Sequence, residues 1–525
     1  MPAHSDGPAG SDTPGPPSPT QHQSVPGRKQ DRIGARDLLG TVLDAGSWQS
    51  WDEPPVVSGD PTPGAYAAEL AAAAVSARTD ESVITGTGRI SGRTIAIVVS
   101  EFRFLAGSIG RAATERLVLA VERATREGLP LLAAPSSGGT RMQEGTRAFV
   151  GMIKIAAAIA QHKAVGLPYI VYLRHPTTGG VLASWGSLGQ FTAAEPGALI
   201  GFLGPRVYEA LFGTQFPSGV QTAENLYQRG LVDAVLPVNA LAGVATRVLN
   251  VLMSPHEDPP TLTELPKDTL PDTPAWESVQ RSRRPDRPGV RELLRLAATD
   301  VVPLNGTGEG EHDPSILLAL ARFGGVPCVV LGQDRHRQTL HRQLGPAGLR
   351  TARRGMRLAG ELHLPLISVI DTQGAALSQE AEEGALAGEI ARCLADLVTL
   401  EAPTLCLLLG QGTGGGAMAL LPADRVICAE HAWLSPLPPE GASAILHRDV
   451  DHAPRLATTQ RIRASDLLAD GIVDRIVSER PDAADYPDQF FARVSHVLRY
   501  ELGRLLRADP GDRLAARLTR FRHLG

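Results

Sequence analysis

Short apolar runs alternate along this chain with longer segments whose apolar residues recur at helical spacing. Residues 130–134 and 169–173 are two such runs, and a helical segment of about residues 143–161 lies between them. Apolar runs of this length, bounded by turn residues, are typical of buried strands. Because strands that alternate with helices form parallel sheets through right-handed crossovers, the pattern predicts an α/β fold.

The same order of segments occurs twice. In each half an apolar run ends in a glycine-bearing turn, and a Gly-Leu-Val-Asp or Gly-Ile-Val-Asp stretch closes the series. The paired segments are residues 130–134 with 365–369, 169–173 with 404–409, 177–183 with 413–419, and 230–233 with 471–474. The repeat predicts two halves that share one fold and form a pseudo-symmetric pair of domains.

Two stretches of low hydrophobicity divide the chain. Residues 1–30 consist largely of Pro, Gly, Ser, Asp and His, and residues 256–274 mix Pro with Asp, Glu and Thr. Such segments bury too little apolar surface to offset the entropy of ordering. We therefore expect a disordered tail at 1–30, a first domain at 31–255, a linker at 256–274 and a second domain at 275–510.

Composition excludes several classes of protein. The 51 basic and 56 acidic side chains give a formal charge of -5, which is unsuited to neutralising nucleic-acid phosphates. The sequence has no apolar segment long enough to span a bilayer and no apolar core of a signal peptide near Met1, so we expect a soluble cytoplasmic protein. The four cysteines form no C-x-x-C pair and are expected to be buried apolar side chains; they are Cys328, Cys393, Cys406 and Cys428.

Glycines that follow a strand and begin a helix mark the candidate chemistry. A backbone without side chains lets a ligand approach, and the N–H groups at a helix start favour negative charge. The candidate residues are Gly138, Gly139, Gly179 and Gly180 in the first half and Gly374, Gly415 and Gly416 in the second. Two such turns in each half could converge N–H donors on one carbonyl oxygen, so the repeat predicts two oxyanion holes and two carbonyl substrates.

Other catalytic patterns are absent from the sequence. The chain contains no G-x-S-x-G elbow, no Walker loop, no H-E-x-x-H and no compact cluster of His, Asp and Cys. Four histidines near strand ends or loops are given no catalytic role; they are His162, His175, His336 and His431. A dinucleotide loop at residues 412–415 is a weak alternative, because the G-x-G-x-x-G spacing is missing.

The residues around the glycine turns resemble a known family. Residues 137–145 (S-G-G-T-R-M-Q-E-G), 176–181 and 195–206 are similar to the β subunit of bacterial acetyl-CoA carboxylase carboxyltransferase. Residues 284–288, 371–375, 410–417 (G-Q-G-T-G-G-G-A) and 438–441 resemble the α subunit of the same enzyme. The resemblance covers about residues 32–479, in β-then-α order.

This resemblance implies two tandem crotonase-like domains and a biotin-dependent carboxyltransferase. Members move a carboxyl group from carboxybiotin, held on a biotin carboxyl carrier protein that biotin carboxylase serves, to an acyl-CoA such as acetyl-CoA, giving malonyl-CoA. By this resemblance Gly138, Gly139, Gly179 and Gly180 polarise the acyl-CoA thioester, and Gly415, Gly416 and Ala417, with Gly374 nearby, hold the biotin ureido oxygen. Biotin acts as its own base in the family. The active site lies between a β-like and an α-like domain, so we expect a dimer of this chain or a larger homo-oligomer.

Three departures from the family pattern are visible in the sequence. No cysteine precedes Cys328, so the zinc ribbon of the β subunit is absent and no structural zinc is expected. Gln373 and Ala376 replace a Pro and a Tyr, and Asp334 stands where a Lys is usual. Two alternatives stay open: an acyl-CoA decarboxylase, which would use the same oxyanion hole, and a non-catalytic assembly subunit.

Overall fold

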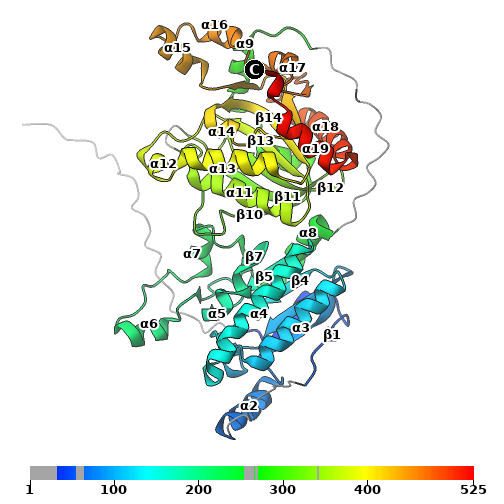
Figure 1. Cartoon of the computed structure of the whole chain (residues 1–525), viewed down its shortest axis with the longest axis vertical. Helices are drawn as coiled ribbons and strands as arrows, with labels where there is room; N and C mark the ends of the chain where they lie inside the picture. The colour runs from blue at the N-terminus through cyan, green and yellow to red at the C-terminus, as the bar shows by residue number, and fades with distance from the viewer. Residues whose placement is uncertain (1–31, 55–63, 254–264, 266–269, 340–341, 525) are drawn as a thin grey trace, which may run out of the picture. The chain divides into compact units, whose positions relative to one another are not determined.

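Two β-sheets, one in each half of the chain, organise the computed structural model, which describes residues 32–54, 64–253, 265, 270–339 and 342–524 (Figure 1). The predicted tail at 1–30 lies outside these residues, as does most of the predicted linker at 256–274. Within the described chain, no helix is both long enough and apolar enough to cross a membrane.

The first sheet has seven strands in the order β1-β2-β3-β4-β5-β7-β9. Its strands are β1 (Gln49–Ser50), β2 (Val83–Ile90), β3 (Arg93–Ser100), β4 (Leu131–Ala134), β5 (Tyr169–Leu173), β7 (Phe191–Ala194) and β9 (Ala234–Val235). The pairings from β3 to β9 are parallel, whereas β1 and β2 add an antiparallel edge. A separate short pair joins β6 (Thr177–Thr178) to β8 (Ile200–Gly201).

The second sheet repeats this plan with eight strands. Its strands are β10 (Thr299–Leu304), β11 (Ile316–Phe323), β12 (Val326–Gln333), β13 (Leu366–Thr372), β14 (Thr404–Thr413), β15 (Arg425–Ala429), β16 (Trp433–Ser435) and β17 (Arg475–Val477). Here β10, β11 and β12 pair antiparallel and the later strands pair parallel. The predicted α/β fold and its internal repeat are confirmed.

Paired helices cover each sheet (Figure 1). In the first half α3 (Arg111–Arg126) packs beside α4 (Gly145–Ala164). Their apolar faces bury Leu117, Val121, Ile155 and Ile159 in one core. In the second half α11 (Pro346–Glu361) and α13 (Leu386–Thr399) occupy the corresponding place. The helical spacing of apolar residues thus corresponds to the face that each helix turns toward its sheet.

The remaining helices lie elsewhere around the two sheets. In the first half they are α1 (Ala35–Val42), α2 (Gly64–Ala77), α5 (Gly179–Leu182), α6 (Pro205–Phe212), α7 (Ala223–Gln228) and α8 (Val238–Met253). In the second they are α9 (Ala275–Ser282), α10 (Val290–Ala297), α12 (Gln379–Glu383), α14 (Gly414–Met418), α15 (Pro439–His447), α16 (Ala453–Thr459), α17 (Ala464–Ala469), α18 (Pro487–Arg507) and α19 (Pro510–Thr519).

The second half extends past residue 510, where the sequence placed its end. Helix α19 is anchored by Arg517, whose Nε donates to Asp424 at 2.8 Å, and by Arg520 just beyond it, whose Nη2 donates to Asp474 at 2.6 Å. Arg517 and Asp424 both have side chains less than 5% exposed. Helix α19 has a largely polar sequence, but its ion pairs hold it against the second sheet.

The two halves are bonded directly to each other. The Gly308 N–H donates to the Gly230 carbonyl at 2.8 Å, and Arg322 Nη1 donates to the Asn250 carbonyl at 2.8 Å. Helix α8 also contacts β10 and β11. These contacts place the end of the first repeat against the start of the second.

Candidate functional site

The two predicted turns of the first half meet in the structure. Ser137 pairs with Thr177 in a parallel bridge, and the Thr178 N–H donates to the Ser137 carbonyl at 2.9 Å. A β-carbon placed on Gly139 would lie 3.5 Å from the Gly179 α-carbon. Gly139 has φ 110° and Gly179 has φ 64°, a region of backbone conformation that favours glycine. Gly139 and Gly179 are 40 residues apart in the sequence but lie in contact, because β4 and β5 end at the same edge of the sheet.

The two turns of the second half meet in the same way. We call each pair of meeting turns a junction: the first is formed by residues 137–139 and 177–180, and the second by residues 372–375 and 412–416. Thr372 at the end of β13 pairs with Gly412 of β14. A β-carbon on Gly416 would lie 3.2 Å from the Ala375 nitrogen and 3.3 Å from the Gly374 carbonyl carbon. Gly374 has φ 136°, and Gly414 has φ 61°. The structure thus brings together both turns of each half, as the repeat predicts.

The register of the repeat differs by one residue from the sequence alignment. Helix α5 begins at Gly179 after Thr178, and helix α14 begins at Gly414 after Thr413. Since both first residues have positive φ, the structure matches Gly179 with Gly414, not with Gly415. Gly180 and Gly415 are therefore equivalent.

Four of the predicted glycines already donate their N–H groups within the chain. The Gly138 N–H donates to the Ala106 carbonyl and the Gly179 N–H to the Phe202 carbonyl, both at 2.9 Å. The Gly139 N–H donates to Ser137 Oγ at 3.0 Å, and the Gly374 N–H donates to Thr372 Oγ1 at 3.1 Å. Buried N–H groups need a partner, and these have one inside the protein. The structure here differs from the predicted set of donors: these glycines let the two turns approach but do not supply free N–H groups.

Gly180 and Gly415 remain as N–H donors. Each is the second residue of its helix, where an N–H group has no acceptor inside the helix, and no other described group accepts from either. Gly180 and Gly415 are partly exposed. Gly416, the third residue of α14, has no acceptor inside its helix either, but it is buried, as is Ala417. Ala417 is the fourth residue of α14, the first whose N–H a helix can bond internally.

The residue that precedes each short helix makes no capping bond. Threonine at this position ordinarily accepts from the N–H of the second or third helical residue, but neither Thr178 nor Thr413 does so. The Thr178 hydroxyl instead donates to the Ser137 carbonyl at 3.3 Å. The Thr413 hydroxyl is buried and has no partner within the described residues. Neither threonine therefore occupies the N–H group of the second helical residue, Gly180 in α5 and Gly415 in α14.

A hydroxyl holds the left-handed glycine of each junction in the same way. Ser137 Oγ accepts from the Gly139 N–H, and Thr372 Oγ1 accepts from the Gly374 N–H; each hydroxyl stands two residues before its glycine. Thr372 also donates to Gln338 Oε1 at 2.7 Å. Sequence reasoning missed these two hydroxyls, although their equal spacing from the glycines was a readable signal.

The ionisable side chains beside the second junction are engaged with each other. Asp371 accepts from the Gln411 N–H at 3.1 Å and pairs with Arg335 Nη1 at 3.2 Å. Asp334, the acid that stands where the family has a lysine, pairs with Arg291 at 2.5 Å. Gln373 is exposed. These residues shape the junction, and none is placed as a free general base.

The cysteines and a buried histidine offer no reactive group. All four cysteines are free and buried, and desolvation raises the pKa of the Cys393 and Cys406 thiols to about 12. Burial also lowers the pKa of His162, whose ring contacts Thr125 and the Pro168 carbonyl. Among the described residues, no group of three or more His, Cys, Asp and Glu side chains is arranged to hold a metal.

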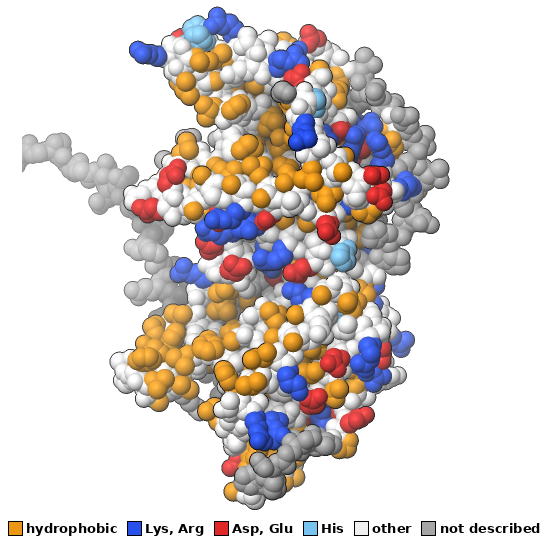
Figure 2. Space-filling view, viewed as in Figure 1, with side chains coloured by type: hydrophobic (Ala, Val, Ile, Leu, Met, Phe, Trp, Pro, Cys, Tyr) orange, Lys and Arg blue, Asp and Glu red, His pale blue; other side chains and the backbone are white. Residues whose placement is uncertain are grey.

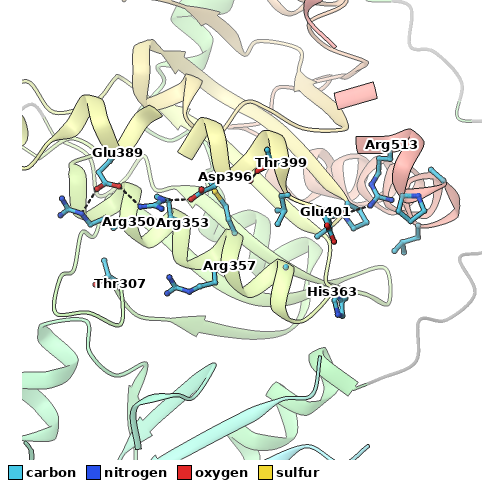
Figure 3. Close-up of a pocket in the computed structure, with 18 of the residues that line it drawn as sticks. Thr307, Arg350, Arg353, Arg357, His363, Glu389, Asp396, Thr399, Glu401 and Arg513 are labelled. Atoms are coloured by element: carbon cyan, nitrogen blue, oxygen red, sulfur yellow. Dashed lines mark hydrogen bonds and ion pairs between the residues drawn. The ribbon is translucent and has the colours of Figure 1, made fainter. Parts of the chain in front are cut away.

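A large cavity of about 1000 Å³ lies elsewhere in the second half, among α11, α13 and the start of α19 (Figure 3). Its charged side chains pair with each other: Arg350 Nε lies 3.1 Å from Glu389, and Arg353 Nε lies 2.6 Å from Asp396. None of the junction glycines lines it.

A smaller cavity of about 790 Å³ adjoins the first junction. Leu182 of α5 and Phe202, whose carbonyl accepts the Gly179 N–H, both line it. Its other apolar lining residues are Leu173, Ile200, Phe216, Val220, Leu226, Leu231 and Val232, and its polar lining includes Gln221, Asn225 and Arg229. A space with a largely apolar wall and a polar side thus lies beside the first junction.

The Carboxyl transferase domain family matches residues 59–507. This chain belongs to the carboxyl transferase family. Relatives agree with that membership over nearly the whole chain. The probable biotin-dependent acyl-coenzyme A carboxylase beta3 subunit of Mycobacterium tuberculosis is 59% identical over 495 residues, covering 94% of this chain and 99% of the relative. The acetyl-coenzyme A carboxylase carboxyl transferase subunits beta/alpha of Salinispora arenicola are 35% identical, covering 94% and 91%.

Solved structures of the carboxyl transferase family share the fold. Transcarboxylase 12S, solved with methylmalonyl-coenzyme A and methylmalonic acid bound, superposes with a TM-score of 0.70 at 20% identity and covers 90% of both chains. A single-chain, multi-domain long-chain acyl-CoA carboxylase gives a TM-score of 0.68 at 18% identity over 91% of this chain and 46% of the other. The predicted pair of crotonase-like domains is confirmed at the level of fold.

Proposed function

We propose that this chain is the carboxyltransferase component of a biotin-dependent acyl-CoA carboxylase. It transfers the carboxyl group from carboxybiotin on a carrier protein to an acyl-CoA. The observation that carries the proposal is the pair of uncapped helices. The side chains of Thr178 and Thr413 make no capping hydrogen bond. Gly180 and Gly415 therefore keep free N–H groups in two equivalent junctions. Two donor sites fit a reaction with two carbonyl substrates.

The first junction is the proposed site of the acyl-CoA thioester. Gly180 donates to the thioester oxygen and stabilises the enolate that forms when the α-carbon loses a proton. Gly138, Gly139 and Gly179 keep this region free of side chains, and the apolar cavity beside α5 gives room for the substrate.

The second junction is the proposed site of the biotin ureido oxygen. Gly415 is the accessible donor, while Gly416, Ala417 and Gly374 form the closely packed backbone behind it. Carboxybiotin supplies the carboxyl group as carbon dioxide, and in the family the biotin freed of that group takes the α-proton before the enolate captures the carbon dioxide. That chemistry agrees with junctions built from backbone donors instead of ionisable side chains.

Acetyl-CoA is the proposed acceptor, which makes malonyl-CoA the product, and propionyl-CoA is the next choice. The relatives' names support an acyl-CoA in general: one names acyl-coenzyme A and another acetyl-coenzyme A. Assays with both acceptors at equal concentration would rank them by kcat/KM.

A biotin carboxyl carrier protein and a biotin carboxylase are the proposed partners, together with a second copy of this chain. Exposed apolar side chains gather over α6 at the lower left of Figure 2 and over α15 at its upper left. They are Phe202, Val207, Leu211 and Phe212 in the first patch and Leu437, Ile445, Leu446 and Val450 in the second. Patches of this kind mark association surfaces. Phe212→Glu and Ile445→Glu should each shift sedimentation toward monomer.

Isotope exchange tests the proposal most directly. Malonyl-CoA labelled in its acetyl carbons is mixed with unlabelled acetyl-CoA and a biotinylated carrier, and the label that reaches acetyl-CoA is followed. Carrier-dependent exchange is the expected result. Release of carbon dioxide without exchange would favour the decarboxylase, and neither activity would favour a non-catalytic assembly subunit.

A further inference from the structure

One buried side chain at the end of β12, Gln333, reaches both turns of the second junction. Its side-chain nitrogen donates to the Gly416 carbonyl at 2.7 Å, and its side-chain oxygen accepts from the Asp371 N–H at 3.1 Å. Gln333 is completely buried. A donor on one side and an acceptor on the other fix the orientation of the carboxamide. The strand that leads into the Gly374 turn is thereby joined to helix α14.

The Gly416 carbonyl is available for this bond because α14 ends early. A continued α-helix would direct the Leu420 N–H to Gly416, but that N–H donates to the Ala417 carbonyl at 3.1 Å. Gln333 therefore satisfies a buried carbonyl that its own helix leaves without a partner. Without the bond, the carbonyl would have to move to find another donor.

Among the residues that the structure describes, the first half shows no equivalent of this link. The position equivalent to Gln333 is Ser100. The pairing of β3 with β4 begins at Ala96, the pairing of β12 with β13 begins at Val329, and each of the two residues lies four positions after that start. Ser100 is also buried, but its hydroxyl has no hydrogen-bond partner among the described residues. Within the described part of the chain, the repeat thus carries a linking side chain at this position in the half assigned to biotin and not in the other.

We propose that Gln333 is a positioning residue for the biotin-side donors. It does not touch a substrate. It holds the first turn of α14 against the Gly374 turn, so that the Gly415 N–H keeps its direction toward the carbonyl. The inference rests on the proposed function, because it assumes that the second junction binds a carbonyl oxygen.

The test compares two substitutions in the full-length chain, with malonyl-CoA as donor and free biotin as acceptor. Gln333→Met, which keeps the length but loses both bonds, should lower the rate of transfer to biotin about 10- to 100-fold, as small misplacements in active sites do. Binding of acetyl-CoA, which reports the first junction and needs no base from biotin, should stay within about twofold of the unsubstituted chain.

Gln333→Glu gives a readout that a purely structural role would not produce. A protonated carboxyl group can donate to Gly416 and accept from Asp371, whereas a carboxylate cannot donate. The charged groups around it are Asp371, Asp334 and Arg335, with Arg291 on α10. Burial raises the pKa of such a carboxyl. Transfer by this variant, divided by that of the unsubstituted chain, should therefore rise as the pH falls from about 8 to about 6.

Ser100→Ala is the matched control, since it changes the equivalent buried position without removing a hydrogen bond of the side chain. It should leave transfer to biotin unchanged. Full transfer activity in Gln333→Met, a flat pH ratio in Gln333→Glu, or equal loss at both junctions would overturn the inference. Gly415→Val separates this failure from failure of the proposed function: if it also leaves transfer intact, the second junction is not the biotin site.

Discussion

Asp233 of the first half and Arg354 of the second form an ion pair with a nitrogen–oxygen distance of 2.9 Å. Both Asp233 oxygens also accept backbone N–H bonds at 2.9 Å, one from Thr192 and one from Asn305. The aspartate is the last residue of the repeated Gly-Leu-Val-Asp stretch. Its counterpart Asp474 accepts from the Val426 N–H at 2.7 Å in the same way. The carboxylate that closes the first half thus also fastens the two halves together, whereas Asp474 bonds within the second half.

Asp233→Asn should lower the free energy of unfolding by about 2–4 kcal/mol, because the new amide group would face a backbone donor and Arg354 would lose its partner. Urea denaturation followed by circular dichroism measures the change. Arg357→Met, at a position more than half exposed and beyond hydrogen-bond distance of Glu309, serves as the control and should alter stability little. Equal effects of the two substitutions would contradict the assigned role of the buried pair.

Valine substitutions at the two junctions should each abolish a different step of the reaction. Gly180→Val places a β-carbon 3.0 Å from Thr140 Oγ1 and should abolish α-proton exchange on the acyl-CoA. Gly416→Val places one 3.2 Å from the Ala375 nitrogen, so it should block transfer to biotin while acyl-CoA still binds. Losses of at least about 10²–10³ in rate are expected when an aimed donor is displaced.

The control for these valines is Gly243→Val on α8, where a β-carbon meets nothing within 4 Å. It should retain both partial reactions. Unimpaired biotin-dependent exchange in Gly416→Val would remove the second junction from the proposed site.

Loss of the Thr372 hydroxyl should disturb the second junction without unfolding the chain. Thr372→Val removes the acceptor that holds the left-handed Gly374, at a cost of about 1 kcal/mol or somewhat more in stability. Thr372→Ser keeps the hydroxyl and should behave like the unsubstituted chain. Steady-state kinetics with biotin as the varied substrate compares the two variants. Similar kinetics in both would contradict a role of the Thr372 hydroxyl in holding the second junction.

Acid sensitivity should depend on Arg287. Burial opposes ionisation of Glu479, yet the charge and hydrogen bonds of Arg287, one at 2.8 Å, lower the pKa of this carboxyl. A lowered pKa stabilises the fold above the pKa of the unfolded chain, about 4.3, and this contribution is lost as the pH falls through the folded value.

Arg287→Met should therefore cost about 3–5 kcal/mol near pH 7, and the difference from the unsubstituted chain should shrink as the pH approaches about 4. Urea denaturation across that pH range measures it. Arg461→Met, which removes an exposed partner of Asp470, should show a small difference at every pH. A difference for Arg287→Met that stays constant with pH would refute the linkage.

Truncation should separate the predicted tail from the folded chain. A chain that begins at residue 31 should keep its melting temperature, because residues 1–30 contain little that can pack. A chain that begins at residue 44 also loses α1, whose Leu38 is fully buried and whose Ala35 N–H donates to Glu101 at 2.8 Å. Only the second truncation should lower the melting temperature by several degrees.

The repeat was readable from the sequence because its signals are local. Gly230 and Asp233 recur as Gly471 and Asp474, and a proline precedes each of the compared strands. Such stretches keep their spacing when a fold is duplicated, so they predict equivalent strands and turns. The α/β architecture and the meeting of the glycine turns both follow from them.

The hydrogen-bond state of the site was not readable, because its partners are distant in sequence. The sequence near Gly179 does not indicate that the Phe202 carbonyl accepts its N–H. The sequence near Gly416 does not indicate that Gln333 donates to its carbonyl. The one-residue shift between Gly179 and Gly414 depends on backbone dihedral angles, which the run of three glycines at 414–416 conceals. Pattern located the junctions, whereas long-range contacts decide which donors are free.

Helices α5 and α14 have four and five residues, far too few to be stable alone in water. Their shape is maintained from outside, by the Gly179 to Phe202 bond in one half and the Gln333 bond in the other. Such segments open in local fluctuations that leave the sheets intact. Amide hydrogen exchange at Ala183 and Ala419, whose N–H groups donate to Gly179 and Gly415, would then be fast in an otherwise protected fold, and on warming the enzyme would lose activity at temperatures where its sheets still give a native spectrum.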